Sequence, residues 1–189
     1  MPIKRTVILC LWLLAPAAQA QLALHEKLTQ AITVWTTPSG QRVTVAHCRY
    51  ARMGCAKRLE LLAQWIEDAA DKHGVDPLVL SAIALHESGL NPFAQGQVGE
   101  AGIMQLHPRG VGRQVRFVKD ERYRDRCKKE PGACQKEVID QAATLLATAT
   151  KTCGSVERAL GYYNTGRCQK NGYAGRVMHR YATLSGLVP

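Results

Sequence analysis

Residues 76–92 read Asp-Pro-Leu-Val-Leu-Ser-Ala-Ile-Ala-Leu-His-Glu-Ser-Gly-Leu-Asn-Pro. Asp76 is a favoured N-cap residue and Pro77 fits the first helical position, so this stretch predicts a helix that begins there. The apolar residues that follow lie on nearly all sides of such a helix, which is typical of a buried one. Because Gly89 is a typical residue just beyond a C-terminus, the predicted helix ends before it and carries Glu87 in its last turn.

The carboxyl group of Glu87 is the candidate catalytic group of this helix. His86 and Glu87 begin the zinc-protease pattern H-E-x-x-H, but position 90 is Leu90, so that metal site is excluded. The negative end of the helix dipole and apolar surroundings both raise the pKa of a carboxyl group. A raised pKa suits a residue that must donate a proton near neutral pH. The alternative interpretation is a surface glutamate at a frayed helix end.

Periodicity predicts further helices around this one. Apolar residues recur at helical spacing over residues 56–73, and Gly74 stands at the C-cap position. The same spacing predicts helices over residues 138–149, 155–163 and 173–184. Residues 32–46 alternate and predict a β-hairpin, whereas the glycine-rich residues 89–112 predict a loop. The predicted fold class is mainly α with one small N-terminal β-hairpin.

Composition fits one globular domain. The chain has 189 residues, of which 46% are hydrophobic and 21% charged, and its formal net charge is +10. These values exclude collagen-like, coiled-coil and multi-span membrane proteins. Nine basic and three acidic residues lie between Arg109 and Lys129, but no recognised nucleic-acid fold accompanies them, so no nucleic-acid partner is expected. The remaining histidines show no ligand spacing, and neither a metal nor a cofactor is expected; they are His25, His47, His73, His107 and His179.

The first twenty residues predict a secretory signal peptide. Lys4 and Arg5 precede an apolar run over residues 7–14, and small residues follow at Ala18 and Ala20. Cleavage is expected after Ala20. A membrane anchor is the alternative, but the run is too short to span a bilayer of about 30 Å. The mature protein is therefore expected to be exported, without a membrane span.

Six cysteines follow the predicted cleavage point, and an even number in an exported chain indicates disulfides. Six cysteines allow 15 pairings, of which pairing between sequence neighbours is preferred because a turn-forming Glu130-Pro131-Gly132 separates two of them. Zinc ligation is the rival interpretation, but no C-x-x-C occurs. The preferred pairs are Cys48–Cys55, Cys127–Cys134 and Cys153–Cys168.

Four motifs in order carry a family resemblance. Glu87-Ser88 is followed by Gly102-Ile103-Met104-Gln105, then by residues 159–166 (Ala-Leu-Gly-Tyr-Tyr-Asn-Thr-Gly), then by Tyr173-Ala-Gly-Arg-Val177. The set resembles the catalytic domain of the soluble lytic transglycosylases over residues 58–185. The resemblance implies a lysozyme-like helical fold. Together with the predicted signal peptide and hairpin, it divides the chain into a signal peptide (1–20), an N-terminal extension with the hairpin (21–55) and the transglycosylase domain (56–189).

The resemblance also implies a reaction, namely cleavage of the MurNAc–GlcNAc bond of peptidoglycan in the periplasm without water, to give 1,6-anhydroMurNAc ends. Glu87 would be the single general acid and base, and Tyr173 would hydrogen-bond its carboxyl group. Ser88 would support Glu87, and substrate-binding roles would fall to Met104, Gln105, Tyr163 and Asn164. The basic segment is then expected to be a solvated face or one attracted to the anionic wall polymer.

Position 96 departs from the family pattern. Some of these enzymes carry a substrate-contacting serine nine residues after the catalytic glutamate, where this chain has Gly96. Groups with glycine there include enzymes that accompany conjugation, secretion and pilus systems, so components of such a system are the expected partners. Two alternatives remain open: a lysozyme-type hydrolase that uses water, and a non-catalytic wall-binding component of such an apparatus.

Overall fold

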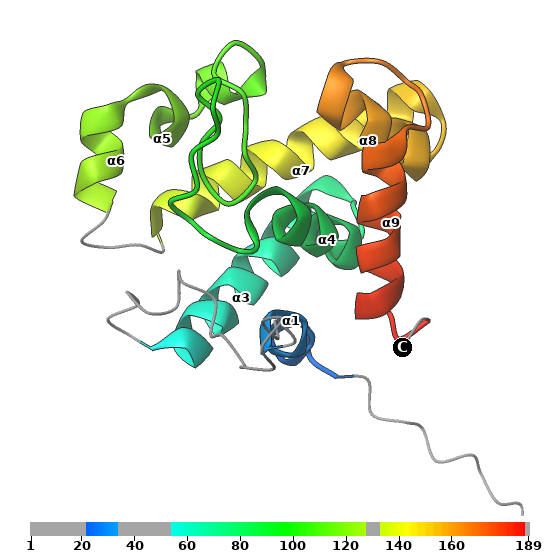
Figure 1. Cartoon of the computed structure of the whole chain (residues 1–189), viewed down its shortest axis with the longest axis horizontal. Helices are drawn as coiled ribbons and strands as arrows, with labels where there is room; N and C mark the ends of the chain where they lie inside the picture. Colours follow the sequence, from blue (N-terminus) through cyan, green and yellow to red (C-terminus); the bar gives the residue numbers. More distant parts are fainter. Residues whose placement is uncertain (1–21, 34–53, 128–132, 188–189) are drawn as a thin grey trace, which may run out of the picture.

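The computed structural model describes residues 22–33, 54–127 and 133–187, and over these residues the protein is mainly helical, with one long loop over residues 89–110 (Figure 1). The helices are α1 (Leu24–Thr33), α3 (Cys55–His73), α4 (Pro77–Ser88), the 3-10 helix η1 (Val111–Gln114), α5 (Arg116–Lys119), α6 (Glu121–Cys127), α7 (Ala133–Cys153), α8 (Val156–Thr165) and α9 (Gly172–Leu184). The mainly α fold class predicted from the sequence is confirmed.

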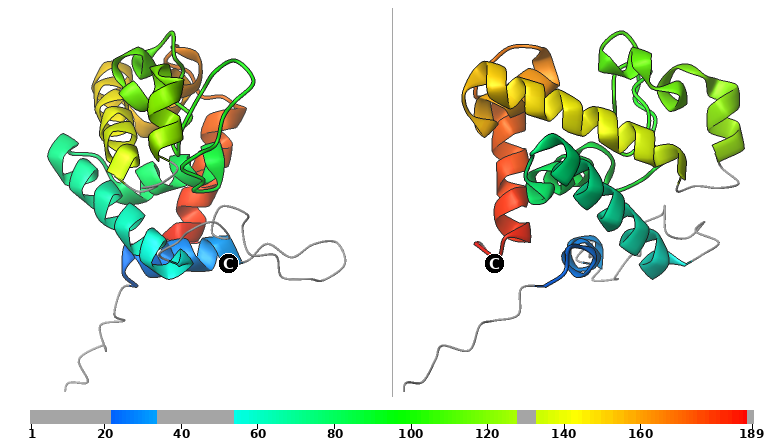
Figure 2. Two further views of the ribbon diagram at one scale, coloured as in Figure 1. Left: turned by 90° about the vertical axis from the view of Figure 1, so that its left-hand side faces the viewer. Right: turned by 180° about the vertical axis from the view of Figure 1, so that it is seen from behind.

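Helix α4 is the centre of the fold, as its sequence predicts. Asp76 caps it by accepting a 2.7 Å hydrogen bond from the Leu78 amide, and Gly89 ends it in the left-handed conformation at φ 60°. Residues 79–85 are all buried. Helices α3 and α9 pack against α4, and α7 lies above α3 in both views of Figure 2 and packs against it before α8 and α9 complete the bundle. The last turn of α4 is thereby held rigidly where a loop and two helices meet.

The N-terminal extension differs in part from its prediction. Residues 32 and 33, the first two of the predicted hairpin, are the end of α1, whose apolar stripe Leu24, Leu28 and Ile32 is buried. Lys27 Nζ also donates to the Leu184 carbonyl at 2.7 Å, which ties α1 to the end of α9. The rest of the hairpin and the signal peptide lie outside the described residues. No helix in the described ranges is long and apolar enough to cross a membrane.

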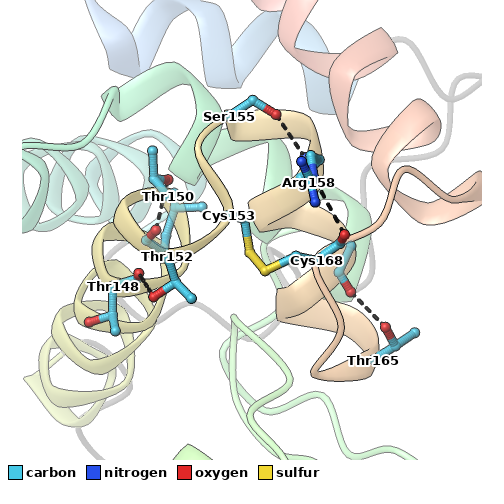
Figure 3. Close-up of a disulfide and its surroundings, with 10 residues drawn as sticks. Thr148, Thr150, Thr152, Cys153, Ser155, Arg158, Thr165 and Cys168 are labelled. Carbon is cyan, nitrogen blue, oxygen red and sulfur yellow. Dashed lines mark hydrogen bonds between the residues drawn. A yellow bond between two sulfur atoms is a disulfide. The ribbon is translucent and has the colours of Figure 1, made fainter.

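Two of the three predicted disulfides are present. Cys127–Cys134 joins α6 to the start of α7 with a Cα–Cα distance of 6.1 Å, and Cys153–Cys168 joins the end of α7 to the segment after α8 at 5.2 Å (Figure 3). Beside the second bond, Arg158 Nε donates to the Cys168 carbonyl. Cys55 is disulfide-bonded as well, while its predicted partner Cys48 lies outside the described residues.

Residues 111–127 of the basic segment, the part that the structure describes from its first helix on, form η1, α5 and α6. Its apolar residues Val115, Phe117 and Val118 are buried against the core. Its cations point outward for the most part: Arg116 pairs with Asp120 and stacks on the ring of Tyr123. The segment is thus a small lobe with a basic outer surface.

Candidate active site

A cleft of about 700 Å³ opens where the end of α4, the loop over residues 94–110 and helix α8 meet. Helix α4, the loop, η1, α7 and α8 therefore all contribute to one surface, which suits an elongated ligand that contacts many side chains at once. The residues lining the cleft are Glu87, Gly96, Gln97, Val98, Glu100, Gln105, Leu106, His107, Gly110, Val111, Leu145, Tyr162, Tyr163, Asn164 and Gly166.

Glu87 has the electrostatics of a general acid. Its side chain is largely withdrawn from solvent, and burial raises the pKa of the carboxyl group to about 7. The Tyr173 hydroxyl donates a 2.6 Å hydrogen bond to Glu87 Oε1, which acts in the opposite direction and lowers that pKa, while the charge of Glu100 raises it further. The carboxyl group is therefore protonated for a substantial fraction of the time near neutral pH.

Tyr173 and Tyr163 form a stacked pair beside this carboxyl group. Their rings are 7° from parallel with centroids 6.4 Å apart, and the edge of His86 meets Tyr173 at 5.0 Å. Burial raises the pKa of both phenols, so both keep their protons and act as donors. Tyr163 Oη donates to the Met104 carbonyl at 3.0 Å, which ties α8 to the loop.

Asn164 lies at the rim of the cleft, next to Asn171. The Asn171 side chain caps α9 by accepting from the Ala174 amide at 2.9 Å, and its amide nitrogen lies 3.4 Å from Asn164 Oδ1. Gly161 lets this arrangement form, because a Cβ atom there would overlap the Gln169 carbonyl. The segment after α8 can thus fold back over the helix and start α9, whose Tyr173 reaches Glu87.

Ser88 supports the site through the backbone of the loop. Its hydroxyl donates to the Ile103 carbonyl at 2.7 Å, with the Ala84 carbonyl 3.1 Å away. The Ile103 amide in turn donates to Gln135 Oε1 at 2.9 Å. Gly102, at φ 85°, leaves room for this contact, since a Cβ atom there would lie 3.0 Å from the same oxygen. The hydroxyl of Ser88 therefore fixes the loop relative to Glu87.

Gln105 is held in a strained conformation facing the cleft. Its φ of 45° lies in the left-handed region, which costs a non-glycine residue of order 1 kcal/mol. Its side-chain nitrogen donates to the carbonyls of Ala94 and Gly102, both at 2.9 Å. These two bonds offset the strain and fix the orientation of the amide, leaving its oxygen free of them.

Met104 differs from its expected place in the groove. Its side chain is fully buried in the core and Met104 is not among the residues lining the cleft. The positive φ of the following residue turns the chain so that Met104 faces inward and Gln105 outward. Met104 contributes its main-chain carbonyl, which receives the Tyr163 hydroxyl.

Sequence reasoning gave no role to Glu100, which lies in the cleft with Glu87. The sequence feature that could have pointed to Glu100 is its place four residues after Gly96, in a loop rich in turn-forming residues. Within the described ranges, no group of three or more His, Cys, Asp or Glu side chains is arranged to hold a metal ion.

Comparison with known proteins identifies relatives of this chain. The family model described as the transglycosylase SLT domain matches residues 64–183. A membrane-bound lytic murein transglycosylase F of Desulfosudis oleivorans is 45% identical over 49 residues, which are 26% of this chain and 11% of that protein. An endo-type membrane-bound lytic murein transglycosylase A of Klebsiella pneumoniae is 44% identical over 55 residues, which are 28% of this chain and 27% of that protein. The chain thus spans between a tenth and about a quarter of the length of these relatives, and no solved structure gives a significant match.

Proposed function

The chain belongs to the transglycosylase SLT family, and from this premise we propose that it is a peptidoglycan lytic transglycosylase. The substrate is the glycan strand, cut between MurNAc and GlcNAc, and the product is a 1,6-anhydroMurNAc end. The names of the relatives, both lytic murein transglycosylases, support the substrate class.

The proposed reaction uses Glu87 twice. Its carboxyl group first protonates the glycosidic oxygen while the bond from that oxygen to the anomeric carbon breaks. The C6 hydroxyl oxygen of the same MurNAc then forms a bond to the anomeric carbon and gives its proton to the Glu87 carboxylate. The carboxyl group is regenerated, and no water enters the product.

The observation that supports this proposal most is the environment of Glu87. The carboxyl group faces the cleft, is held by Tyr173 at 2.6 Å and has a pKa raised to about 7. A group with a pKa near the working pH exchanges a proton in both directions, as a single acid and base must. We propose substrate-binding roles for Gln105, Tyr163 and Asn164 in the cleft.

The compartment proposed for this activity is the periplasm. The disulfides are typical of an exported protein, and the predicted signal peptide over residues 1–20 supports export with cleavage after Ala20. A role beside a conjugation, secretion or pilus system is the finer proposal, supported by Gly96 and by the predicted export signal. Identifying the neighbouring genes tests that role.

A second candidate function is hydrolysis of the same bond, favoured by one observation. Glycosidases of the hydrolytic kind use two carboxylates, and Glu100 shares the cleft with Glu87. In that mechanism the second carboxylate would activate a water molecule, and its loss would cost the enzyme as much as the loss of the first.

The experiment that tests the proposal is a digest of purified peptidoglycan in heavy-oxygen water. The proposed lyase releases muropeptides with unlabelled 1,6-anhydroMurNAc ends, each one water lighter than a hydrolysis product. Labelled reducing ends as the main product would assign the chain to the hydrolases. No cleavage by oxidised wild-type protein would favour a non-catalytic wall-binding component.

A further inference from the structure

Glu100 lies in the proposed substrate cleft in a defined conformation. Its Oε2 accepts a hydrogen bond from the Val98 amide at 3.2 Å, and its own carbonyl accepts from the Gly96 amide at 2.9 Å. In the turn over residues 96–100, the Glu100 side chain therefore folds back toward the backbone of Val98, and the carboxylate stays at the wall of the cleft. No partner for Oε1 is found among the described residues, so a carboxylate that lines the cleft keeps one oxygen without a hydrogen-bond partner there.

Gly96 is what makes room for this carboxylate. A Cβ atom built on Gly96 would overlap Glu100 Oε2 and would lie 3.0 Å from Cδ and 3.1 Å from Cβ of the same side chain. Both residues line the cleft. The Glu100 carboxylate thus occupies the space in which any side chain at position 96 would begin.

We propose that Glu100 contacts the glycan substrate, accepting a hydrogen bond from a sugar hydroxyl or acetamide N–H group at the position where residue 96 provides no side chain. Such sugars present many donors along a strand, and a carboxylate is the strongest acceptor that a side chain offers. The inference rests on the proposed function only in its choice of a glycan as the ligand.

A second observation agrees with a place close to the reacting group. The negative charge of Glu100 raises the pKa of Glu87, so the two carboxyl groups influence each other across the cleft. Glu100 would therefore have two separable effects: its oxygen holds the sugar, and its charge adds to the rise in the pKa of Glu87 that burial causes. Glu100→Gln removes the charge and keeps an acceptor oxygen, whereas Glu100→Ala removes both.

The test measures binding apart from cleavage. In a Glu87→Gln background, affinity for peptide-free glycan strands is expected to fall about 10-fold with Glu100→Ala and clearly less with Glu100→Gln. In the otherwise wild-type enzyme, Glu100→Gln is expected to move the alkaline limb of kcat/KM to lower pH, because Glu87 loses a like charge. Glu67→Gln, an exposed carboxylate on α3 outside the cleft, is the matched control and should change neither quantity.

The double variant Gly96→Ser/Glu100→Ala tests whether another hydrogen-bonding group at the same place in the cleft can replace the Glu100 carboxylate. The serine hydroxyl at position 96 would occupy the space that the carboxylate leaves, so part of the lost affinity for glycan should return. The Cβ atom of residue 100, which remains in the alanine variant, would have to move by a few tenths of an ångström to make room for the serine. No recovery, together with a Glu100→Gln affinity as low as that of Glu100→Ala, would show that Glu100 only shapes its own turn, which overturns the proposed contact.

The outcomes separate this inference from the proposed function. Unchanged glycan affinity in Glu100→Ala, with an unchanged alkaline limb in Glu100→Gln, overturns the inference even if the wild type cleaves. Weakened affinity together with a wild type that does not cleave supports the inference and contradicts the lyase activity. If Glu100→Ala proves less stable by thermal melting, Glu100→Gln, which has the same shape, decides by its binding and pH profile.

Discussion

The Tyr173 hydroxyl donates to Glu87 Oε1 at 2.6 Å, across a sequence separation of 86 residues. Tyr173 lies in the first turn of α9 and Glu87 in the last turn of α4, two helices that pack directly against each other. The position of the proposed acid is therefore set by the packing of the core and by one buried phenol, not by its own helix alone.

Replacing Tyr173 by phenylalanine should slow the enzyme without unfolding it. The ring keeps its contacts with Tyr163 and His86, but the carboxyl group loses its donor. We expect a loss of roughly 10- to 100-fold in kcat/KM, corresponding to about 1.4–2.7 kcal/mol. Tyr181→Phe, on the same helix but away from the carboxyl group, is the control for any loss of a phenol. Wild-type turnover in Tyr173→Phe would show that the tyrosine only fills the core.

The rate should depend on pH through Glu87. Since its pKa is raised to about 7, kcat/KM should be constant at lower pH and fall about 10-fold per unit above 7. Tyr173→Phe should move this alkaline limb to higher pH, because the lost hydrogen bond had lowered the pKa. A rate that stays constant from pH 6 to pH 9 would mean that another group supplies the proton.

The stability of the folded protein should also depend on pH through Glu87, and it should decrease as the pH rises. The Glu87 pKa is about 7 in the folded protein against 4.5 for an unperturbed carboxyl group, so its contribution to stability is present below 4.5 and lost as the pH rises through 7. Glu87→Gln should therefore match the wild type in urea unfolding at pH 4 and be more stable by about 2 kcal/mol at pH 8, allowing for partial solvent exposure. Equal stability at both values would mean that the carboxyl group is well solvated.

The helices that frame the site could be predicted because their ends carry local signals. Asp76, Pro77 and Gly89 fix the ends of α4, and Gly74 fixes the end of α3, by rules that act within one turn. Helix α1 was missed although Leu24, Leu28 and Ile32 stand at helical spacing. Its three-residue stripe is short, and the alternation that begins at residue 32 competes with it.

The loop that forms part of the candidate site could be predicted only in part, because its apolar residues follow neither the helical nor the strand spacing. Residues 94–110 turn through positive φ values at Gly99, Gly102 and Gln105, so spacing does not tell which side chains face the cleft. Met104 therefore faces the core, although it was expected in the groove, and Glu100, for which the sequence predicted no role, lines the cleft. The role of Ser88 likewise depends on a carbonyl 15 residues away, a contact that tertiary folding creates.

Each disulfide should stabilise the domain by an amount that increases with the length of the loop that it closes. Cys153–Cys168 closes 15 residues and Cys127–Cys134 closes 7, so chain entropy gives about 3 kcal/mol for the first and less for the second. In urea unfolding, the double variant Cys153→Ser/Cys168→Ser should therefore lose more stability than the double variant Cys127→Ser/Cys134→Ser.

Non-reducing peptide mapping should find both pairs and Cys48–Cys55, with Gln21 as the first residue of the mature protein. A Cys48–Cys168 link, or a free thiol in the exported protein, would contradict the neighbour pairing.

Glu87→Gln should abolish cleavage and leave the cleft intact. The amide has the shape of the carboxyl group and still accepts from Tyr173, but it has no acidic proton to give. Loss of general acid catalysis alone costs about 10²–10⁴ in rate, and here the same group also serves as the base. The variant should therefore bind peptidoglycan in a pull-down while clearing none of it in a zymogram. The matched control is Glu67→Gln, which removes an exposed carboxylate from α3 and should clear as the wild type does. Clearing by Glu87→Gln at more than about a tenth of the wild-type rate would assign the proton transfer to another residue, and Glu100 would be the next carboxyl group to replace.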